Sequence, residues 1–286
     1  MSACQPPVSA PDRNRPIGLF DSGIGGLTVL RAIKARLPQE HLLYLGDTAR
    51  LPYGTKSRET IVRYTLKAAQ KLVDEGVKML VVACNTATSA ALPSLREHFA
   101  PLPVLGVVEP GAQAAVNATR NGRIAVIATE ATIADGAYQR AISRLLPEAS
   151  VLGRPCTLFV PLAEEGWLDG PVVEGTAHRY LDDIFQGADG AERPDTLVLG
   201  CTHFPLFASL LQRVVGPQVH IVDSAATTAQ AVDEALRRQQ LRRQAAGGER
   251  GACRFLTTDN CRRFVRTAGF FLGQPLQAGE VELVNI

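Results

Sequence analysis

Short, predominantly apolar runs alternate along this chain with longer segments whose apolar residues recur at helical spacing. PIGLF at 16–20, KMLVVAC at 78–84 and TLVLGC at 196–201 are such runs. A strand that is apolar on both faces must be covered on both faces, as in a parallel sheet flanked by helices. The alternation therefore predicts an α/β fold with mainly parallel sheets.

The spacing and the turn residues predict the elements in chain order. A strand at 17–20 leads through a Gly-rich turn into a helix that ends at Pro38, and a helix at 58–76 is closed by Gly76. The sequence predicts further strands at 41–47, 78–84, 103–109, 193–201 and 220–224, and a helix at 227–244. We expect a late strand and helix, 253–273, to return and complete the first sheet.

The plan of the chain repeats once. GRIAVIATEATIADGAYQRAI at 122–142 follows the same strand–turn–helix plan as 18–33, and RPDTLVLGC at 193–201 corresponds to GVKMLVVAC at 76–84. We interpret this as a degenerate internal duplication. It predicts two pseudo-symmetric α/β domains with an active site at their interface: a flexible leader at 1–15, a first domain at 16–98 plus 210–286, and a second domain at 99–209.

The bulk composition is that of an ordinary globular chain. The 286 residues are 46% hydrophobic and 20% charged, with a net charge of +2, so the sequence gives no support to binding of nucleic acid or a membrane surface. We expect no membrane span and no secretory signal. The six cysteines, at 4, 84, 156, 201, 253 and 261, lack zinc-site spacing, which predicts no metal site. In a chain of this size without a secretory signal, we expect the thiols to be reduced and the location to be cytoplasmic.

Two of these cysteines end apolar strands in matching contexts, VVACNTATSA at 81–90 and LVLGCTHFPL at 197–206. In parallel α/β sheets, ligands bind where strands end and helices begin, so Cys84 and Cys201 are placed to meet a ligand. A lone cysteine at such a position is more often buried core, and the other four cysteines keep that interpretation. Repetition of the whole unit favours a functional pair. The polar neighbours suit the charged ends of an amino acid: Asn85, Thr86, Thr202 and His203.

Two thiols from halves that pack face to face would approach one ligand from opposite sides. Inversion of a stereocentre by proton transfer needs a base on one face and an acid on the other, and one fixed group reaches only one face. A thiolate would remove the α-proton while the opposite thiol delivers another. Such a reaction requires no cofactor.

Several long motifs resemble those of the glutamate racemase family. They are FDSGIGGLTVLR at 20–31, YLGDTARLPYG at 44–54, VVACNTATSAALPSLRE at 81–97, VEPG at 108–111, PLAEEG at 161–166, LVLGCTHFPL at 197–206 and FLTTDNCRRF at 255–264. The resemblance implies an isomerase that interconverts L- and D-glutamate without a cofactor and supplies D-glutamate for peptidoglycan synthesis, and hence for cell shape. It implies Cys84 as the acid/base for D-glutamate and Cys201 for L-glutamate.

The resemblance also implies the supporting residues. Asp21 and His203 match groups that each assist one thiol, and Asp47 matches a further carboxylate near the site. The glutamate of the PLAEEG motif maps to Glu164, and Glu165 is adjacent to it. The implied substrate contacts are Asp21, Ser22, Tyr53, Gly54, Asn85, Thr86, Thr202 and His203. A homodimer is expected, and binding to DNA gyrase is left open. The leader, the Gly/Arg-rich stretch at 245–252, and a TTDNCRRF motif without its Gly-Asp depart from the family pattern.

Three alternatives remain from the sequence. The first is a racemase of the same superfamily that acts on aspartate or another amino acid; His203 after the second Cys-Thr favours glutamate. The second is a cysteine hydrolase with Cys201 as nucleophile and His203 as base, which leaves Cys84 unexplained and gives a Cys-x-His pair poor geometry for an oriented dyad. The third is a thiol-based regulatory or binding protein without catalysis.

Overall fold

The computed structural model describes residues 12–186, 193–244 and 248–286. Most of the expected leader and part of the 245–252 stretch lie outside these residues. Within them, the strands form two parallel sheets, a six-stranded one in the order β10-β9-β2-β1-β3-β4 and a four-stranded one in the order β6-β5-β7-β8. The predicted α/β class with parallel sheets is confirmed.

The strands of the first sheet are β1 (Ile17–Asp21), β2 (Leu42–Gly46), β3 (Met79–Val82), β4 (Val104–Gly106), β9 (Cys253–Thr257) and β10 (Val281–Leu283). Those of the second sheet are β5 (Arg123–Ala128), β6 (Ser150–Pro155), β7 (Thr196–Gly200) and β8 (His220–Asp223). We call the first sheet with its covering helices the first unit, and the second sheet with its helices the second unit.

The repeated plan is visible in the topology. The order β2-β1-β3-β4 in the first sheet has its counterpart in β6-β5-β7-β8 in the second, so β1 corresponds to β5 and β3 to β7. The first sheet then gains β9, which pairs with β2, and β10. The late strand and helix therefore return to the first sheet, as the sequence predicts.

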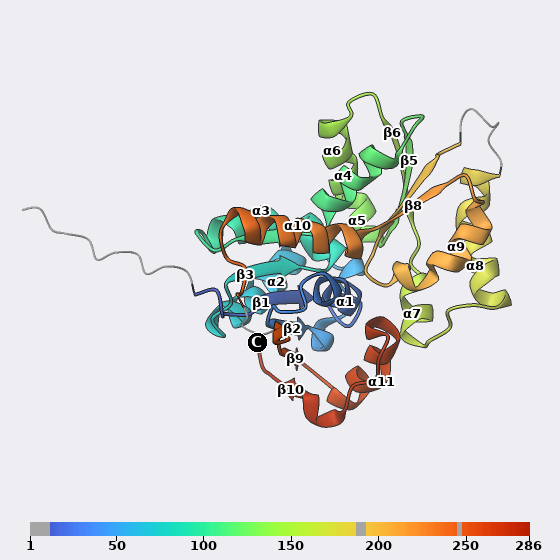
Figure 1. Ribbon diagram of the computed structural model, residues 1–286. Helices are drawn as coiled ribbons and strands as arrows, with labels where there is room; N and C mark the ends of the chain where they lie inside the picture. Colours follow the sequence, from blue (N-terminus) through green and yellow to red (C-terminus); the bar gives the residue numbers. More distant parts are fainter. Residues whose placement is uncertain (1–11, 187–192, 245–247) are drawn as a thin grey trace, which may run out of the picture.

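Helices cover both units, and Figure 1 shows α10 running between the two sheets. The longer helices are α1 (Leu27–Arg36), α2 (Arg58–Asp74), α3 (Asn85–His98), α4 (Val108–Ala118), α6 (Ala137–Leu145), α8 (Pro171–Phe185), α9 (Ala208–Val215), α10 (Ser224–Arg238) and α11 (Cys261–Leu272). Two short helices, α5 (Glu130–Asp135) and α7 (Phe159–Glu164), lie near the cavity described below. Helix α10 packs against α1 of the first unit and α4 of the second.

The change of sheet does not fall at the expected domain boundaries, 98/99 and 209/210. Strand β4 pairs with β3 in the first sheet, and β8 pairs with β7 in the second. In each case the helix after the strand returns the chain to the same sheet, and the next strand pairs beside the previous one, as in parallel crossovers. The division into two domains remains a prediction, and sheet membership favours boundaries nearer 106 and 223.

Helix α2 shows how local sequence sets these elements. The Ser57 side chain caps its N-terminus by accepting a hydrogen bond from Thr60 N, and Gly76, with φ of 78°, follows its end. One face is buried, through Ile61, Thr65, Ala68, Ala69 and Leu72. Among the described residues, no helix combines the length and apolar character needed to cross a membrane.

Candidate active site

A cavity of about 130 Å³ opens between the two units at the carboxyl ends of their strands. Both Cys84 and Cys201 line it, and the side chain of each cysteine is only slightly exposed. Cys84 follows β3 and Cys201 follows β7, which are equivalent strands of the repeated plan. The two thiols thus reach one cavity from corresponding positions.

Further predicted residues line the same cavity: Ser22, Tyr53, Gly54, Asn85, Thr86, Glu164, Thr202 and His203. Asp21 and Asp47 are not among the lining residues. Both carboxylates are buried behind the cavity wall and contact groups that line it, Asp21 through Gly23 and Asp47 through Tyr53. The cavity is therefore lined by thiols, hydroxyls, an amide, an imidazole and two carboxylates, those of Glu130 and Glu164, a set suited to a small polar ligand.

Cys84 lies at the N-terminus of α3. Its Sγ accepts a hydrogen bond from Ala87 N at 3.4 Å, and its thiol donates to Ser22 Oγ at 3.3 Å. Burial, and then the neighbouring Asp21 carboxylate, raise the pKa of Cys84 to about 12, although both hydrogen bonds act in the opposite direction. In the free site at neutral pH, Cys84 therefore carries its proton and can serve as an acid.

Cys201 lies in a different local setting. A 3-10 turn at Phe204–Phe207 separates it from α9, and Pro205 occupies the first turn of that segment. Proline has no N–H to donate and favours an early turn position. Cys201 is consequently not a helix cap. Its polar contact is with His203, whose Nδ1 lies 3.8 Å from Cys201 Sγ.

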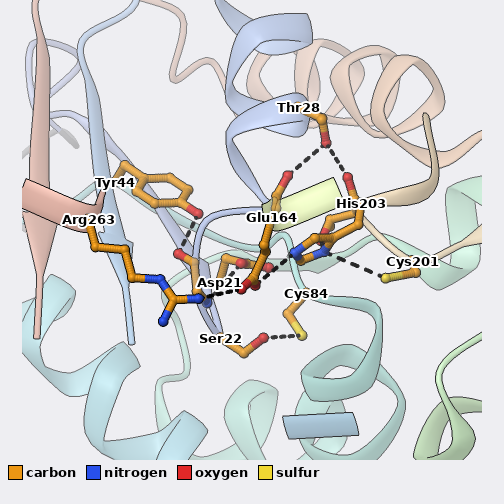
Figure 2. Close-up of polar contacts among 12 residues, drawn as sticks. Asp21, Ser22, Thr28, Tyr44, Cys84, Glu164, Cys201, His203 and Arg263 are labelled. Atoms are coloured by element: carbon orange, nitrogen blue, oxygen red, sulfur yellow. Dashed lines mark hydrogen bonds and ion pairs between the residues drawn. The ribbon is translucent and has the colours of Figure 1, made fainter. Parts of the chain in front are cut away.

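A chain of polar contacts leads away from Cys201 (Figure 2). The other ring nitrogen of His203, Nε2, lies 3.3 Å from Oε1 of Glu164, and the second carboxylate oxygen, Oε2, accepts a hydrogen bond from Arg263 Nη2 at 3.1 Å. Glu164, rather than the adjacent Glu165, thus contacts the histidine. The imidazole is held between a sulfur and a carboxylate.

This arrangement favours the charged form of His203. Burial alone would lower the pKa of the imidazole, but the contacts with Cys201 and Glu164 outweigh it and raise the pKa of His203 to about 10. For Glu164, burial would raise the pKa of the carboxyl, yet His203 and Arg263 hold it below its ordinary value. His203 and Glu164 therefore form an imidazolium–carboxylate pair at neutral pH.

Asp21 ends β1 and is almost completely buried. Its Oδ2 accepts a hydrogen bond from Gly23 N at 2.9 Å, whereas no partner within the described residues satisfies Oδ1. Burial raises the pKa of Asp21, and the charge of His203 opposes that rise. Asp21 is thus coupled electrostatically to both Cys84 and His203.

Asp47 is fully buried and organises the wall around Tyr53. The Tyr53 hydroxyl donates to Asp47 Oδ2 at 2.5 Å, and Thr258 Oγ1 donates to Oδ1 at 2.9 Å. Arg50 lies 3.5 Å from the same carboxylate. The TTDN segment, at the end of β9, therefore positions the loop that carries Tyr53 and Gly54.

The amide of Asn85 is oriented from the second unit. The Tyr138 hydroxyl donates to Asn85 Oδ1 at 2.7 Å, which leaves the buried Nδ2 without a partner among the described residues. Thr86 Oγ1 lies 2.9 Å from Thr129 Oγ1, at the equivalent strand end in the second unit. A buried unpaired N–H donor beside the cavity is a ready contact for a ligand carboxylate.

The glycines of the GIGG turn bring the two units together. A Cβ on Gly25 would lie 2.3 Å from Thr202 Oγ1 and 2.5 Å from His203 Nδ1. The neighbouring Thr28 donates to the backbone oxygen of Thr202 at 3.1 Å. The turn therefore allows a close approach between the end of β1 and the Cys-Thr-His segment, rather than a phosphate site.

Comparison with known proteins agrees with this geometry. Residues 26–232 match the profile of the Asp/Glu/Hydantoin racemase family. The glutamate racemase of Geobacter metallireducens is 48% identical over 272 residues, which cover 95% of this chain and 97% of the relative. The chain belongs to the glutamate racemase family.

Solved structures of glutamate racemases share the whole fold. Glutamate racemase from Francisella tularensis, solved in complex with D-glutamate, has a TM-score of 0.87 and 35% identity, and the match covers 96% of this chain and 98% of that chain. The Escherichia coli enzyme, solved with L-glutamate and the activator UDP-MurNAc-ala, has a TM-score of 0.72 and 30% identity, with coverage of 90% and 95%. The family resemblance seen in the motifs is thus confirmed over nearly the full chain.

Membership of the glutamate racemase family decides against the hydrolase alternative, although the geometry objection raised from the sequence does not hold. Cys201, His203 and Glu164 do form a contiguous thiol–imidazole–carboxylate chain. The turn after Cys201 lets the imidazole fold back toward the sulfur. What a hydrolase would leave unexplained is Cys84 on the same cavity.

Some contributors to the site carry no recognisable signal in the sequence. Arg263 contacts Glu164 from α11, Tyr138 orients Asn85 from α6, and Phe271 packs its ring 5.1 Å from the His203 ring. Thr129 and Glu130 line the cavity at the end of β5; only the repeated plan, which equates β5 with β1, could have indicated them.

In the described part of the chain, no group of three or more His, Cys, Asp or Glu side chains could hold a metal ion.

We expect His203 to make the stability of the fold depend on pH. Because the pKa of His203 is raised in the folded state, to about 10, its contribution is full below about pH 6.5 and is lost as the pH rises toward 10. The difference in unfolding free energy between wild type and His203→Asn should shrink by on the order of 2–3 kcal/mol across this range. Urea unfolding near pH 6.5 and near pH 10 measures it. An equal difference at both pH values would contradict the assigned charge of His203.

Proposed function

We propose that this chain interconverts L- and D-glutamate by proton transfer between two thiols, Cys84 and Cys201, that face the substrate α-carbon from opposite sides. The single observation that carries this mechanism is the shared cavity: two buried cysteines at equivalent strand ends of a repeated plan line one space. Family membership supports the substrate, since the relatives are glutamate racemases.

In the direction from L- to D-glutamate, Cys201 as thiolate removes the α-proton and Cys84 as thiol protonates the opposite face. The proton on Cys84 in the free site suits it as the acid of this direction. His203 Nδ1 lies beside the Cys201 Sγ that removes this proton. In the reverse direction the roles exchange, and no net proton is gained or lost by the pair.

The other polar residues support this exchange. Ser22 accepts the hydrogen bond of the Cys84 thiol, and the His203 imidazolium, held by Glu164, lies beside Cys201 Sγ. The buried carboxyl of Asp21 interacts electrostatically with Cys84 and with His203, the partner of Cys201. Asp47 acts through Tyr53 and the shape of the cavity wall.

The substrate contacts follow from the groups left free around the cavity. The unpaired Asn85 Nδ2 is directed to a carboxylate of the substrate. Hydroxyls and backbone groups complete the set of contacts that we propose: Ser22, Tyr53, Gly54, Thr86, Thr202 and His203. Positioning of the α-carbon between the two sulfurs then converts both proton transfers into steps within one complex.

The test is a racemisation assay on purified protein without added cofactor, followed by circular dichroism. Because enantiomers have equal free energy, the signals from L- and from D-glutamate should converge on the same racemic end point. Aspartate and alanine serve as controls for substrate choice, and glutamate should be turned over roughly 10- to 200-fold faster than aspartate, which is one methylene shorter. A constant signal with both glutamate enantiomers would sink the proposal, and preference for aspartate would replace it with the superfamily alternative.

We also infer a cytoplasmic location and a homodimer. The cysteines of the described residues are free thiols, as in a reducing compartment, and D-glutamate for peptidoglycan is the product typical of the family. The second unit exposes several large apolar side chains, among them Leu152, Leu158, Trp167 and Val172, and exposed apolar surface suits contact with another copy. Light scattering should give twice the 30.6 kDa mass of one chain; a monomer would refute the dimer. Binding to DNA gyrase is not part of the proposed function.

A further inference from the structure

Helix α11 belongs to the first unit, yet two of its side chains contact the groups around Cys201 in the second unit. Phe271 lies against the His203 ring in an edge-on arrangement, with centroids 5.1 Å apart. Arg263 reaches Glu164 from the same helix, and its Nη2 donates to Oε2 at 3.1 Å. The helix therefore contacts both members of the imidazolium–carboxylate pair, as Figure 2 shows for Arg263 and Glu164.

The Glu164 carboxylate divides its two oxygens between two partners. Oε1 faces His203 Nε2 and Oε2 faces Arg263. The side chain of Glu164 is only 12% exposed, so water replaces a lost partner poorly. Of the Lys and Arg side chains in the described ranges, Arg263 is the one in ion-pair contact with Glu164. Loss of this guanidinium would leave Glu164 Oε2 without its hydrogen-bond partner among the described residues, and the carboxylate would be held toward the imidazole less firmly.

We propose that Arg263 is a positioning residue for the Cys201 side of the reaction: its guanidinium holds the Glu164 carboxylate against His203 and so keeps the imidazole directed at Cys201 Sγ. This inference rests on the proposed function and deepens it by adding a residue outside the cavity. Arg263 does not line the cavity and is itself half-exposed, so it acts through Glu164 and not on the substrate.

Removal of the guanidinium has a defined electrostatic consequence. Glu164 would lose the contact that orients its carboxylate toward His203, and this weakens the contact that stabilises the imidazolium. Loss of a like charge has the opposite sign, but that charge acts on the imidazole only from across the carboxylate, so the loss of orientation dominates. The titratable and charged groups that face His203 or its partner are Asp21 at the end of β1, Cys201 in the same turn, Glu164 from α7 and Arg263 from α11. Because Asp21 and Cys201 are unchanged in a variant of Arg263, the expected effect is a partial loss of proton affinity at His203, roughly 0.5–1 pH unit.

The experiment compares wild type with Arg263→Gln, Arg263→Lys and Arg266→Gln. Arg266 is exposed on the same helix, and its side chain makes no hydrogen bond or ion pair to the described residues, so it is a matched control for charge removal. An NMR pH titration follows the imidazole signal of His203, assigned by its disappearance in His203→Asn. Melting temperatures verify that each variant is folded.

We expect the His203 titration midpoint to fall by roughly 0.5–1 unit in Arg263→Gln and to return most of the way in Arg263→Lys, since a single N–H donor makes the contact. Arg266→Gln should titrate as wild type. With glutamate as substrate, Arg263→Gln should lower kcat by roughly 3- to 10-fold, with a matching shift of the alkaline limb of the pH profile.

Two results would overturn the inference. One is an Arg263→Gln titration and pH profile indistinguishable from those of Arg266→Gln. The other is a loss of kcat in Arg263→Gln with no shift of the midpoint and no rescue by lysine, which would make the ion pair a clamp between the units. Because the titration needs no turnover, it tests Arg263 even if the protein proves inactive on glutamate, an outcome that would count against the proposed function alone.

Discussion

Replacement of either cavity thiol by serine is expected to abolish nearly all racemisation of glutamate. A serine hydroxyl fits the space but is a far weaker acid and base than a thiol, so one of the two proton transfers loses its partner. We expect Cys84→Ser and Cys201→Ser each to lower kcat by at least about 10²–10⁴-fold, the contribution of general acid–base groups. Circular dichroism with L- and D-glutamate measures the loss. Cys253→Ser, on β9 and outside the cavity, is the matched control and should keep wild-type activity.

Racemisation rates alone do not show which thiol serves which enantiomer. The enantiomers have equal free energy, so every variant must have the same kcat/KM in both directions. Exchange of the α-proton with deuterium oxide does separate the thiols, because the remaining thiol can still remove a proton from the face that it reaches. We expect Cys84→Ser to retain exchange on L-glutamate and Cys201→Ser to retain it on D-glutamate. Retention of the same enantiomer by both variants would contradict thiols on opposite faces.

Gly25→Ala is expected to have the second largest effect, although it adds one methyl group outside the cavity lining. The new Cβ would lie 2.3 Å from Thr202 Oγ1 and 2.6 Å from His203 Cε1. Neither side chain can give way easily, because both are buried and His203 is held by Glu164 and Phe271. We expect a loss of roughly 10²-fold in kcat/KM, as displaced catalytic groups cause, and destabilisation of about 1–3 kcal/mol from overpacking.

The assay pairs kinetics with urea unfolding, so that activity lost through unfolding is recognised. The control is Gly175→Ala within α8, where an added Cβ meets no atom within 4 Å. That substitution should leave activity unchanged and raise stability by up to about 1 kcal/mol, because alanine favours helices more than glycine does. Near wild-type activity in Gly25→Ala would contradict the prediction, because it would show that the close contact of Gly25 with Thr202 and His203 is not needed to position the groups around Cys201.

Several features of the molecule follow from local sequence because they depend on neighbours along the chain. Apolar runs such as 78–84 become buried parallel strands, and the repeated strand–Cys unit reappears as equivalent positions in two sheets of the same strand order. Elements whose ends depend on packing are less predictable. The strand expected at 103–109 stops at Gly106 so that α4 can begin at Val108, and the helix expected at 227–244 runs from Ser224 to Arg238.

The amino-acid sequence alone establishes which functional groups are present: two thiols at matching strand ends, with polar residues beside each. How those groups act depends on the folded chain. It placed both thiols on one cavity but gave Cys84 a helix N-terminus and Cys201 an imidazolium. It also brought Arg263 and Phe271, from the last helix of the chain, against the partners of Cys201. Such contacts join segments far apart in the chain, and proton affinities depend on burial and charge in space, so no local pattern of residues encodes them.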